Sequence, residues 1–171
     1  MKVYQGRAWV FPANVTTDEI IPGKYLDRAN HEVGEFAMSG IDPGFVKKIK
    51  QGDLIVAGSN FGSGSGRETA PIAIQLAGIS AVIAPSFARI FFRNSINIGL
   101  PAVIIDTVED IKDGDEITLD LNARILKNAR TKKEYHTLNL NGTSMEILKA
   151  GGIIPFTKQR IKNMNNSKGT S

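Results

Sequence analysis

The sequence predicts an α/β fold with a parallel core and an added β-rich layer. Three continuous apolar runs, at residues 53–58, 80–85 and 102–106, are each bounded by turn residues. Such runs are typical of strands that are buried on both faces of a sheet. Helical patterns at 69–77 and 86–99 separate the runs, and this alternation indicates parallel strands joined by right-handed crossovers.

The N-terminal part is expected to add one strand and a long irregular segment. Residues 8–11 predict a short buried strand that ends at Pro12, and residues 14–23 are loop-like and closed by Pro-Gly. The polar stretch 24–44 contains three glycines. We expect it to be a mobile loop, because long loops in small domains are usually functional or only partly ordered.

The helix expected at residues 86–99 has signals at both ends. Ser86 is placed to cap its N-terminus, and Gly99 is placed to end it. We expect structural or subunit-interface roles for three of its polar residues: Arg89, Arg93 and Asn94.

Beyond residue 107 the pattern changes to short alternating strands. Residues 113–121 predict a half-exposed strand, 122–124 a turn, and 125–126 the start of a return strand. A further strand is expected at 135–138 and a short capped helix at 144–150.

The composition is that of a globular protein, with 42% hydrophobic and 22% charged residues in 171. No apolar run is long enough to span a membrane, and the N-terminus lacks the apolar core of a signal peptide. We therefore expect a cytoplasmic protein without membrane contact.

The net charge of +4 lies in the C-terminal stretch, where Lys158, Arg160, Lys162 and Lys168 account for all of it. Since the chain has no internal repeat or linker, we predict one domain at residues 1–157 and a flexible, basic, polar tail at 158–171. The tail lacks interleaved aromatic residues and a basic stripe, so no nucleic-acid partner is expected.

Cysteine is absent, and His31 and His136 are the only histidines. These counts exclude a disulfide, a thiol nucleophile and a thiolate-held zinc ion or iron–sulfur cluster built by this chain alone. Two histidines are also too few for a multi-histidine site. We predict no metal and no cofactor bound by this chain.

The glycine-rich stretch at residues 58–68 carries the chemical signal, because it follows a buried strand and opens a helix. Ser65 and Glu68 match a capping box. Three interpretations are open: a capped turn, a nucleotide site, or a small-anion site with Arg67 as a carboxylate fork and Ser65 as a reactive hydroxyl. The stretch fits neither phosphate-binding motif, G-x-x-x-x-G-K-[ST] or G-x-G-x-x-G.

Three separated motifs, in order, carry a resemblance to a known family. They are NxxTDxIxPxxYL at 14–26, GSNFGSGSGRETAP at 58–71, and SFARIFFRN with NxGLP at 86–101. This set resembles the small subunits of 3-isopropylmalate dehydratase and homoaconitase, and the swivelling C-terminal domain of aconitase. It covers about residues 9 to 105.

The resemblance implies a swivelling three-layer β/β/α domain that acts with a separate large subunit. That subunit is expected to carry a [4Fe-4S] cluster, in a heterodimer or heterotetramer, and the substrate to be a di- or tricarboxylate hydroxy acid. The family's catalytic serine falls on Ser65 and its carboxylate-binding arginine on Arg67. Further residues, in the motifs or directly after the first of them, are expected to bind substrate or support the site: Gly66, Asp27, Arg28, Asn60, Glu68, Thr17 and Asp18.

Two departures from the family pattern leave the substrate open. The family usually has Ser-Ser-Arg-Glu-His where residues 65–69 read Ser-Gly-Arg-Glu-Thr. The residues that line the distal group of the substrate in this family are here Asp27 and Arg28. Isopropylmalate isomerisation is the leading prediction. Homoaconitase, a dimethylmaleate or methylmalate hydratase, and a stand-alone dicarboxylate-binding module are the alternatives.

Overall fold

The computed structural model describes residues 2–29, 31–138 and 142–168. The strands within these ranges form one mixed sheet. The strand order is β4-β3-β2-β1-β5-β6-β7. The strands are β1 (Val3–Phe11), β2 (Leu54–Ala57), β3 (Ala81–Ala84), β4 (Ala102–Ile104), β5 (Glu116–Asp120), β6 (Ile125–Asn128) and β7 (Glu134–His136).

Strand β1 joins a parallel half of the sheet to an antiparallel half. Its second part, from Ala8 to Phe11, pairs in parallel with β2, and its first part, from Val3 to Arg7, pairs antiparallel with β5. The pairs β2–β3 and β3–β4 are parallel, as the three apolar runs predicted. Strands β5 to β7 form the antiparallel half.

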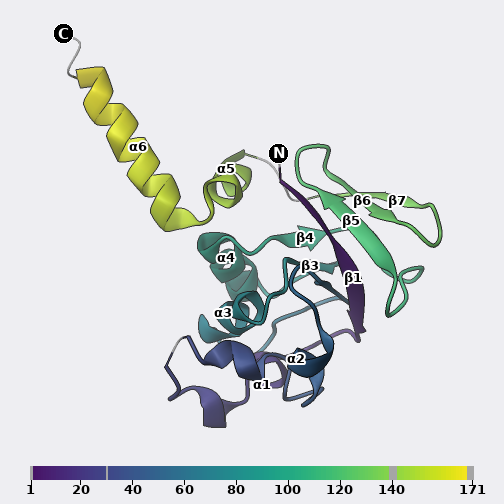
Figure 1. Cartoon of the computed structure of the whole chain (residues 1–171). Helices are drawn as coiled ribbons and strands as arrows, with labels where there is room; N and C mark the ends of the chain where they lie inside the picture. The colour runs from purple at the N-terminus through teal and green to yellow at the C-terminus, as the bar shows by residue number, and fades with distance from the viewer. Residues whose placement is uncertain (1, 30, 139–141, 169–171) are drawn as a thin grey trace.

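The helices follow the strands closely. They are α1 (Thr17–Ile20), α2 (Phe45–Lys48), α3 (Thr69–Leu76), α4 (Arg89–Ile98), α5 (Gly142–Ala150) and α6 (Ile153–Lys168), with 3-10 turns η1 (Gly23–Tyr25) and η2 (Val33–Phe36). Figure 1 shows α3 and α4 on one side of the parallel strands and β5 to β7 on the other.

Two hydrophobic cores lie between the three layers, one on each side of the parallel strands. Ile55 and Ala57 of β2 face the core shared with the helices, whereas Leu54 and Val56 face the core shared with the antiparallel strands. Each strand of the parallel half is therefore buried on both faces, which is why it reads as a continuous apolar run. The predicted β/β/α fold is confirmed.

Two buried carboxylates stand just before strands, Asp53 before β2 and Asp115 before β5, and each accepts hydrogen bonds from a neighbouring segment. Asp53 accepts hydrogen bonds from the Arg7 amide (3.0 Å) and Trp9 Nε1 (2.8 Å). Burial by itself raises the pKa of Asp53, but hydrogen bonds, including one from the Lys50 amide, lower it overall. The hydrogen bonds from Arg130 hold the pKa of Asp115 well below its usual range.

The segment 24–44 differs from the mobile loop that its composition suggested. Its middle packs against the body, since Val33 and Met38 are fully buried. Backbone hydrogen bonds join it to α1, from Met38 to Ile20 (2.7 Å) and from Gly40 to Glu19 (2.9 Å).

The C-terminal part also differs from expectation, because α6 runs across the predicted boundary between residues 157 and 158. The helix extends away from the body of the molecule (Figure 1). Residues 158–168 are therefore helical, and residues 169–171 of the predicted tail lie outside the described residues. No helix within the described ranges is both long and apolar enough to cross a membrane.

Candidate active site

The glycine-rich loop between β2 and α3 is joined by backbone hydrogen bonds to the segment that leads into α1. The Gly62 amide donates to the Val15 carbonyl and the Thr17 amide to the Ser63 carbonyl, each at 2.8 Å. Two of the three sequence motifs thus meet along one line of hydrogen bonds, although they are more than forty residues apart.

Gly62 is required by the packing of this loop. Its φ is +81°, and a Cβ there would lie 2.2 Å from Cγ of Phe91. A side chain would therefore be strained by its backbone conformation and would also collide with a fully packed aromatic ring. The loop is held against α4 only because this position has no side chain.

Ser65 faces α1. Its Oγ lies 3.3 Å from Oγ1 of Thr17, and the same Thr17 hydroxyl is 3.1 Å from the Ser65 carbonyl oxygen. Thr17 is buried, whereas Ser65 is exposed. A fixed hydroxyl thus holds a serine that remains accessible to a ligand.

Arg67 lies on the same side and is oriented by Asp18. Its Nη1 donates to Oδ1 of Asp18 at 2.5 Å and to the Ile21 carbonyl at 3.4 Å. No hydrogen bond is found for Nε or Nη2 among the described residues. This leaves the planar edge of Nε and Nη2 available, which is the edge that binds a carboxylate with two parallel hydrogen bonds.

The predicted capping box at Ser65 and Glu68 is wrong. Helix α3 begins at Thr69 with Glu68 at its N-cap and no side-chain cap. The capping box lies instead at α1, where Thr16 Oγ1 accepts from the Glu19 amide (3.2 Å) and Glu19 Oε2 accepts from the Thr16 amide (2.7 Å). It fixes the start of α1, the helix that presents the partners of Ser65 and Arg67.

The predicted cap of α4 is also wrong. Ala88 occupies the N-cap position, and Ser86 Oγ instead accepts a hydrogen bond from the backbone N–H of Asn60 at 2.8 Å. The end of α4 at Gly99 is as predicted, with a φ of +84°. Asn60 also donates to Oδ1 of Asn14 (3.0 Å), so its observed contacts shape the loop and do not involve Ser65.

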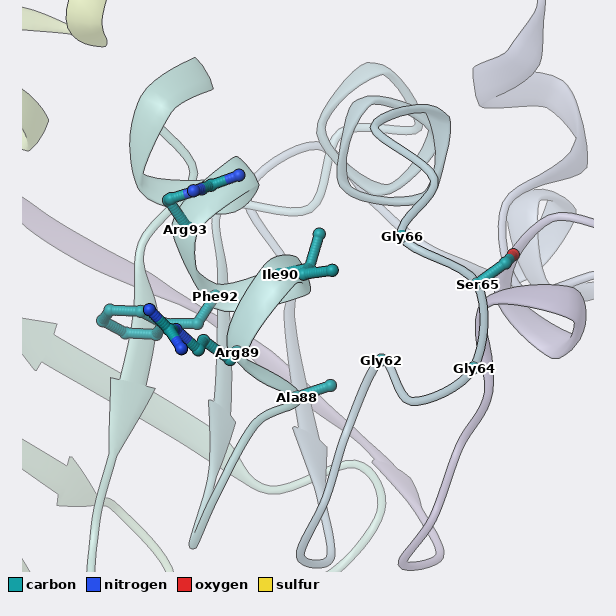
Figure 2. A pocket seen from close by; sticks show the side chains of 9 residues that line it. All are labelled: Gly62, Gly64, Ser65, Gly66, Ala88, Arg89, Ile90, Phe92 and Arg93. Carbon is teal, nitrogen blue, oxygen red and sulfur yellow. The ribbon is translucent and has the colours of Figure 1, made fainter.

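A cavity of about 720 Å³ opens between the loop and the start of α4. Figure 2 shows Arg89, Ile90 and Arg93 on one wall and the backbone of the loop on the other, with the Ser65 hydroxyl pointing away from α4. The cavity therefore borders the side of the glycine-rich loop opposite to the Ser65 hydroxyl. The i, i+4 spacing of Arg89 and Arg93 is the sequence signal for this shared wall.

The backbone amides of the loop are only partly free. The Arg67 amide donates to the Ser65 carbonyl (2.8 Å), so it is not available to an anion. No acceptor is found for the amides of Gly64, Ser65 and Gly66 within the described ranges. Gly66 also has Ile90 beside it, since a Cβ there would lie 3.0 Å from Cδ1 of Ile90.

Asp27 and Arg28 are not brought into contact with Ser65 or Arg67. Both are exposed, and they form no ion pair with each other in the described part of the chain. The guanidinium of Arg28 lies 5.8 Å from the centre of the Phe36 ring, which stacks on Tyr25. A role for the pair in binding the distal group of the substrate remains a prediction.

Comparison with known proteins places this geometry in a family. Residues 12–107, more than half of the chain, match the family model described as the aconitase C-terminal domain. The chain belongs to that family. The resemblance read from the three motifs is confirmed. Because full-length relatives in this family are named 3-isopropylmalate dehydratase small subunits, the chain is a subunit of an aconitase-type hydro-lyase.

Relatives extend the match over nearly the whole chain. The 3-isopropylmalate dehydratase small subunit of Aquifex aeolicus is 50% identical over 161 residues, which are 92% of this chain and 96% of the relative. The isopropylmalate/citramalate isomerase small subunit of Methanocaldococcus jannaschii is 46% identical over 161 residues, 93% of this chain and 96% of the relative.

A crystal structure of 3-isopropylmalate dehydratase from Methanocaldococcus jannaschii has the same fold. It aligns with a TM-score of 0.91 at 46% identity and covers 98% of this chain and 99% of its own. Within residues 2–29, 31–138 and 142–168, no cluster of three or more histidine or acidic side chains is placed to hold a metal ion.

Proposed function

We propose that this chain is the small subunit of a 3-isopropylmalate dehydratase that interconverts 2-isopropylmalate and 3-isopropylmalate in leucine biosynthesis. The proposal extends to the chain what the names of its full-length relatives say of them. It also assumes a cytoplasmic enzyme assembled with a large subunit.

One observation in the chain itself carries the proposal. The two residues expected to act on the substrate, Ser65 and Arg67, contact the two neighbouring residues Thr17 and Asp18 of another motif. A capped glycine turn requires neither contact. A site that must hold a carboxylate beside a reactive hydroxyl requires both groups to be oriented.

Arg67 would bind a substrate carboxylate through Nε and Nη2 while Asp18 retains Nη1. Asp18 is 69% exposed and the Arg67 side chain only 25%. The ion pair therefore contributes little to stability, and its main effect is on the direction of the guanidinium.

Ser65 would remove the proton from the carbon next to the bound carboxylate. A serine hydroxyl is a weak acid, so the alkoxide has to be stabilised by donors in a site closed to water. The Thr17 hydroxyl, 3.3 Å from Ser65 Oγ, and the Gly66 amide, for which no acceptor is found among the described residues, are the donors we assign to that oxygen. A positive charge at Arg67 adds to this effect.

Loss of this proton and of the substrate hydroxyl gives an unsaturated acid and water. Return of the proton to the carbon that held the hydroxyl, with water added at the other carbon, gives the isomer. A cluster on the large subunit supplies Lewis acidity toward the hydroxyl when it is bound there. The chain contains no cysteine, so thiolate ligands for a cluster have to come from the partner.

Reconstitution tests the proposal. The chain should be inactive alone and should convert 3-isopropylmalate after addition of the cluster-loaded large subunit encoded in the same genome. Homocitrate, citramalate and dimethylmaleate serve as competing substrates, since Asp27 and Arg28 also suit a charged or small distal group. A higher kcat/KM for any of these three would replace isopropylmalate as the substrate, and dicarboxylate binding without turnover in any pairing would reject the enzyme.

A further inference from the structure

A stack of four side chains lies outside the chemistry described above. The rings of Tyr25 and Phe36 are parallel within 10°, and their centres are 3.9 Å apart. Nζ of Lys24 lies 4.9 Å from the centre of the Tyr25 ring. The guanidinium carbon of Arg28 lies 5.8 Å from the centre of the Phe36 ring. Two rings at contact distance leave no room for a cation between them, so each cation covers an outer face of the stack.

The stack joins a fixed segment to an exposed one. The 3-10 turn η2, which carries Phe36, is fixed to α3, because Gly34 is buried and a Cβ there would lie 2.7 Å from Cβ of Leu76. Residues 24–28, in contrast, are half-buried or exposed. Phe36 is therefore the fixed end of the stack, and Arg28 is the end that it holds.

The turn η1 also borders the arginine that is expected to bind the substrate. A Cβ at Gly23 would lie 3.9 Å from Nη2 of Arg67, on the edge of the guanidinium that is proposed to take a carboxylate. Two i, i+3 hydrogen bonds, from the Leu26 and Arg28 amides, continue the 3-10 spacing past η1. At about 2.0 Å per residue, Arg28 lies roughly 10 Å along this turn from Gly23. A substrate held by Arg67 thus has Arg28 within reach of its distal group.

The contact with the Phe36 ring is the one observed restraint on the Arg28 guanidinium. No ion pair or side-chain hydrogen bond is found for Arg28 in the part of the chain that the structure describes. While it lies on the ring, this cation is kept from the distal group of a substrate. Released from the ring, it would attract a distal carboxylate and would gain nothing from an alkyl group.

We propose that Phe36 is a specificity-determining residue, which holds the Arg28 guanidinium on its ring and thereby favours a substrate with an alkyl distal group over one with a distal carboxylate. This inference rests on the proposed function and names the residue that selects the substrate there. Phe36 acts through Arg28, so it is a positioning residue.

Three malates substituted at C2 provide the test, because they differ in the distal group alone: isopropyl in 2-isopropylmalate, methyl in citramalate and carboxyethyl in homocitrate. With the cluster-loaded large subunit bound, kcat/KM is measured for 2-isopropylmalate, and homocitrate and citramalate are measured as competitors. Phe36→Leu removes the ring and keeps an apolar side chain. The ratio of the homocitrate inhibition constant to the citramalate constant should fall about two- to fivefold, as expected for loss of an exposed cation–π contact. Phe36→Tyr keeps the ring and should keep the wild-type ratio.

Two further variants separate this role from a structural one. Introduced into Arg28→Gln, Phe36→Leu should cause no further change in the ratio, since no cation is left to release. Phe11→Leu is the matched control, because Phe11 is a half-buried ring at the same core that meets Phe45 edge-on, and no cation lies over it among the described residues. It should lower the melting temperature and leave the ratio unchanged.

Three results overturn the inference: an unchanged ratio in Phe36→Leu, a shift of the same size in the Arg28→Gln background, or an equal shift in Phe11→Leu. If the wild-type complex turns over 2-isopropylmalate while one of these holds, the proposed function stands without a role for Phe36. If the wild-type complex prefers homocitrate or does not turn over 2-isopropylmalate, the proposed function fails, and this inference fails with it.

Discussion

Replacing Arg67 by lysine removes the planar fork while keeping the positive charge. In the structure one nitrogen, Nη1, donates to Asp18 and to the Ile21 carbonyl, and no described residue accepts a hydrogen bond from Nε or Nη2. A lysine has one ammonium group and cannot serve Asp18 and both carboxylate oxygens with the same geometry. At least one charge-assisted hydrogen bond to the substrate is therefore lost.

The size of the effect follows from that count. A hydrogen bond to a charged group contributes about 1.5–3 kcal/mol, so kcat/KM of the reconstituted enzyme should fall roughly 10- to 100-fold for Arg67→Lys. Stability should hardly change, since Asp18 is 69% exposed and exposed ion pairs contribute about 0.2–1 kcal/mol.

The assay compares kcat/KM for 3-isopropylmalate at saturating large subunit with the melting temperature of each variant. Asp18→Asn is the matched control, because it leaves the fork intact and weakens only its orientation, so its loss should be smaller than that of Arg67→Lys. Retention of kcat/KM within about threefold by Arg67→Lys would refute bidentate carboxylate binding.

Two further predictions concern the frame around the site. Gly62→Ala should destabilise the subunit by about 3 kcal/mol in urea unfolding, from backbone strain and the collision with Phe91. Gly114→Ala is the control: its φ is +88° and no atom lies within 4 Å of the added Cβ, so it should show the backbone strain alone. Asp115→Asn should lower stability by about 2 kcal/mol at neutral pH. Because Arg130 lowers the pKa of Asp115 in the folded state, that difference should persist above about pH 4 and shrink as the pH falls further; a constant difference down to pH 2 would contradict it.

The parallel half of the fold could be read from the sequence because both faces of its strands are buried. Leu54 to Ala57 are all fully buried, so no polar residue interrupts the apolar run. The grouping of Ser65 and Arg67 with Thr17 and Asp18 was expected from the resemblance of separated motifs. The hydrogen bonds that join them depend on tertiary pairing, which local periodicity does not record.

The capping-box pattern failed to locate a helix start because two segments of the chain match it equally well. Thr16 with Glu19 and Ser65 with Glu68 both fit the capping-box pattern, and the choice between them depends on which serine or threonine faces a helix start. Helix α6 was missed for a related reason. Its sequence has little apolar periodicity. Its first turn packs Phe156 against the core shared with the antiparallel strands. We infer that this contact starts the helix and that the remaining turns propagate from it.

The central claim is that Ser65 is the catalytic base of a two-subunit hydro-lyase. The most direct test is kcat of Ser65→Ala, reconstituted with saturating cluster-loaded large subunit, with binding of the variant verified separately. Removal of a positioned base should lower kcat by about 10²- to 10⁴-fold, with the melting temperature and the affinity for the large subunit preserved. Near-normal turnover by Ser65→Ala would show that another group removes the proton, and the account of the loop as the reactive element would be wrong.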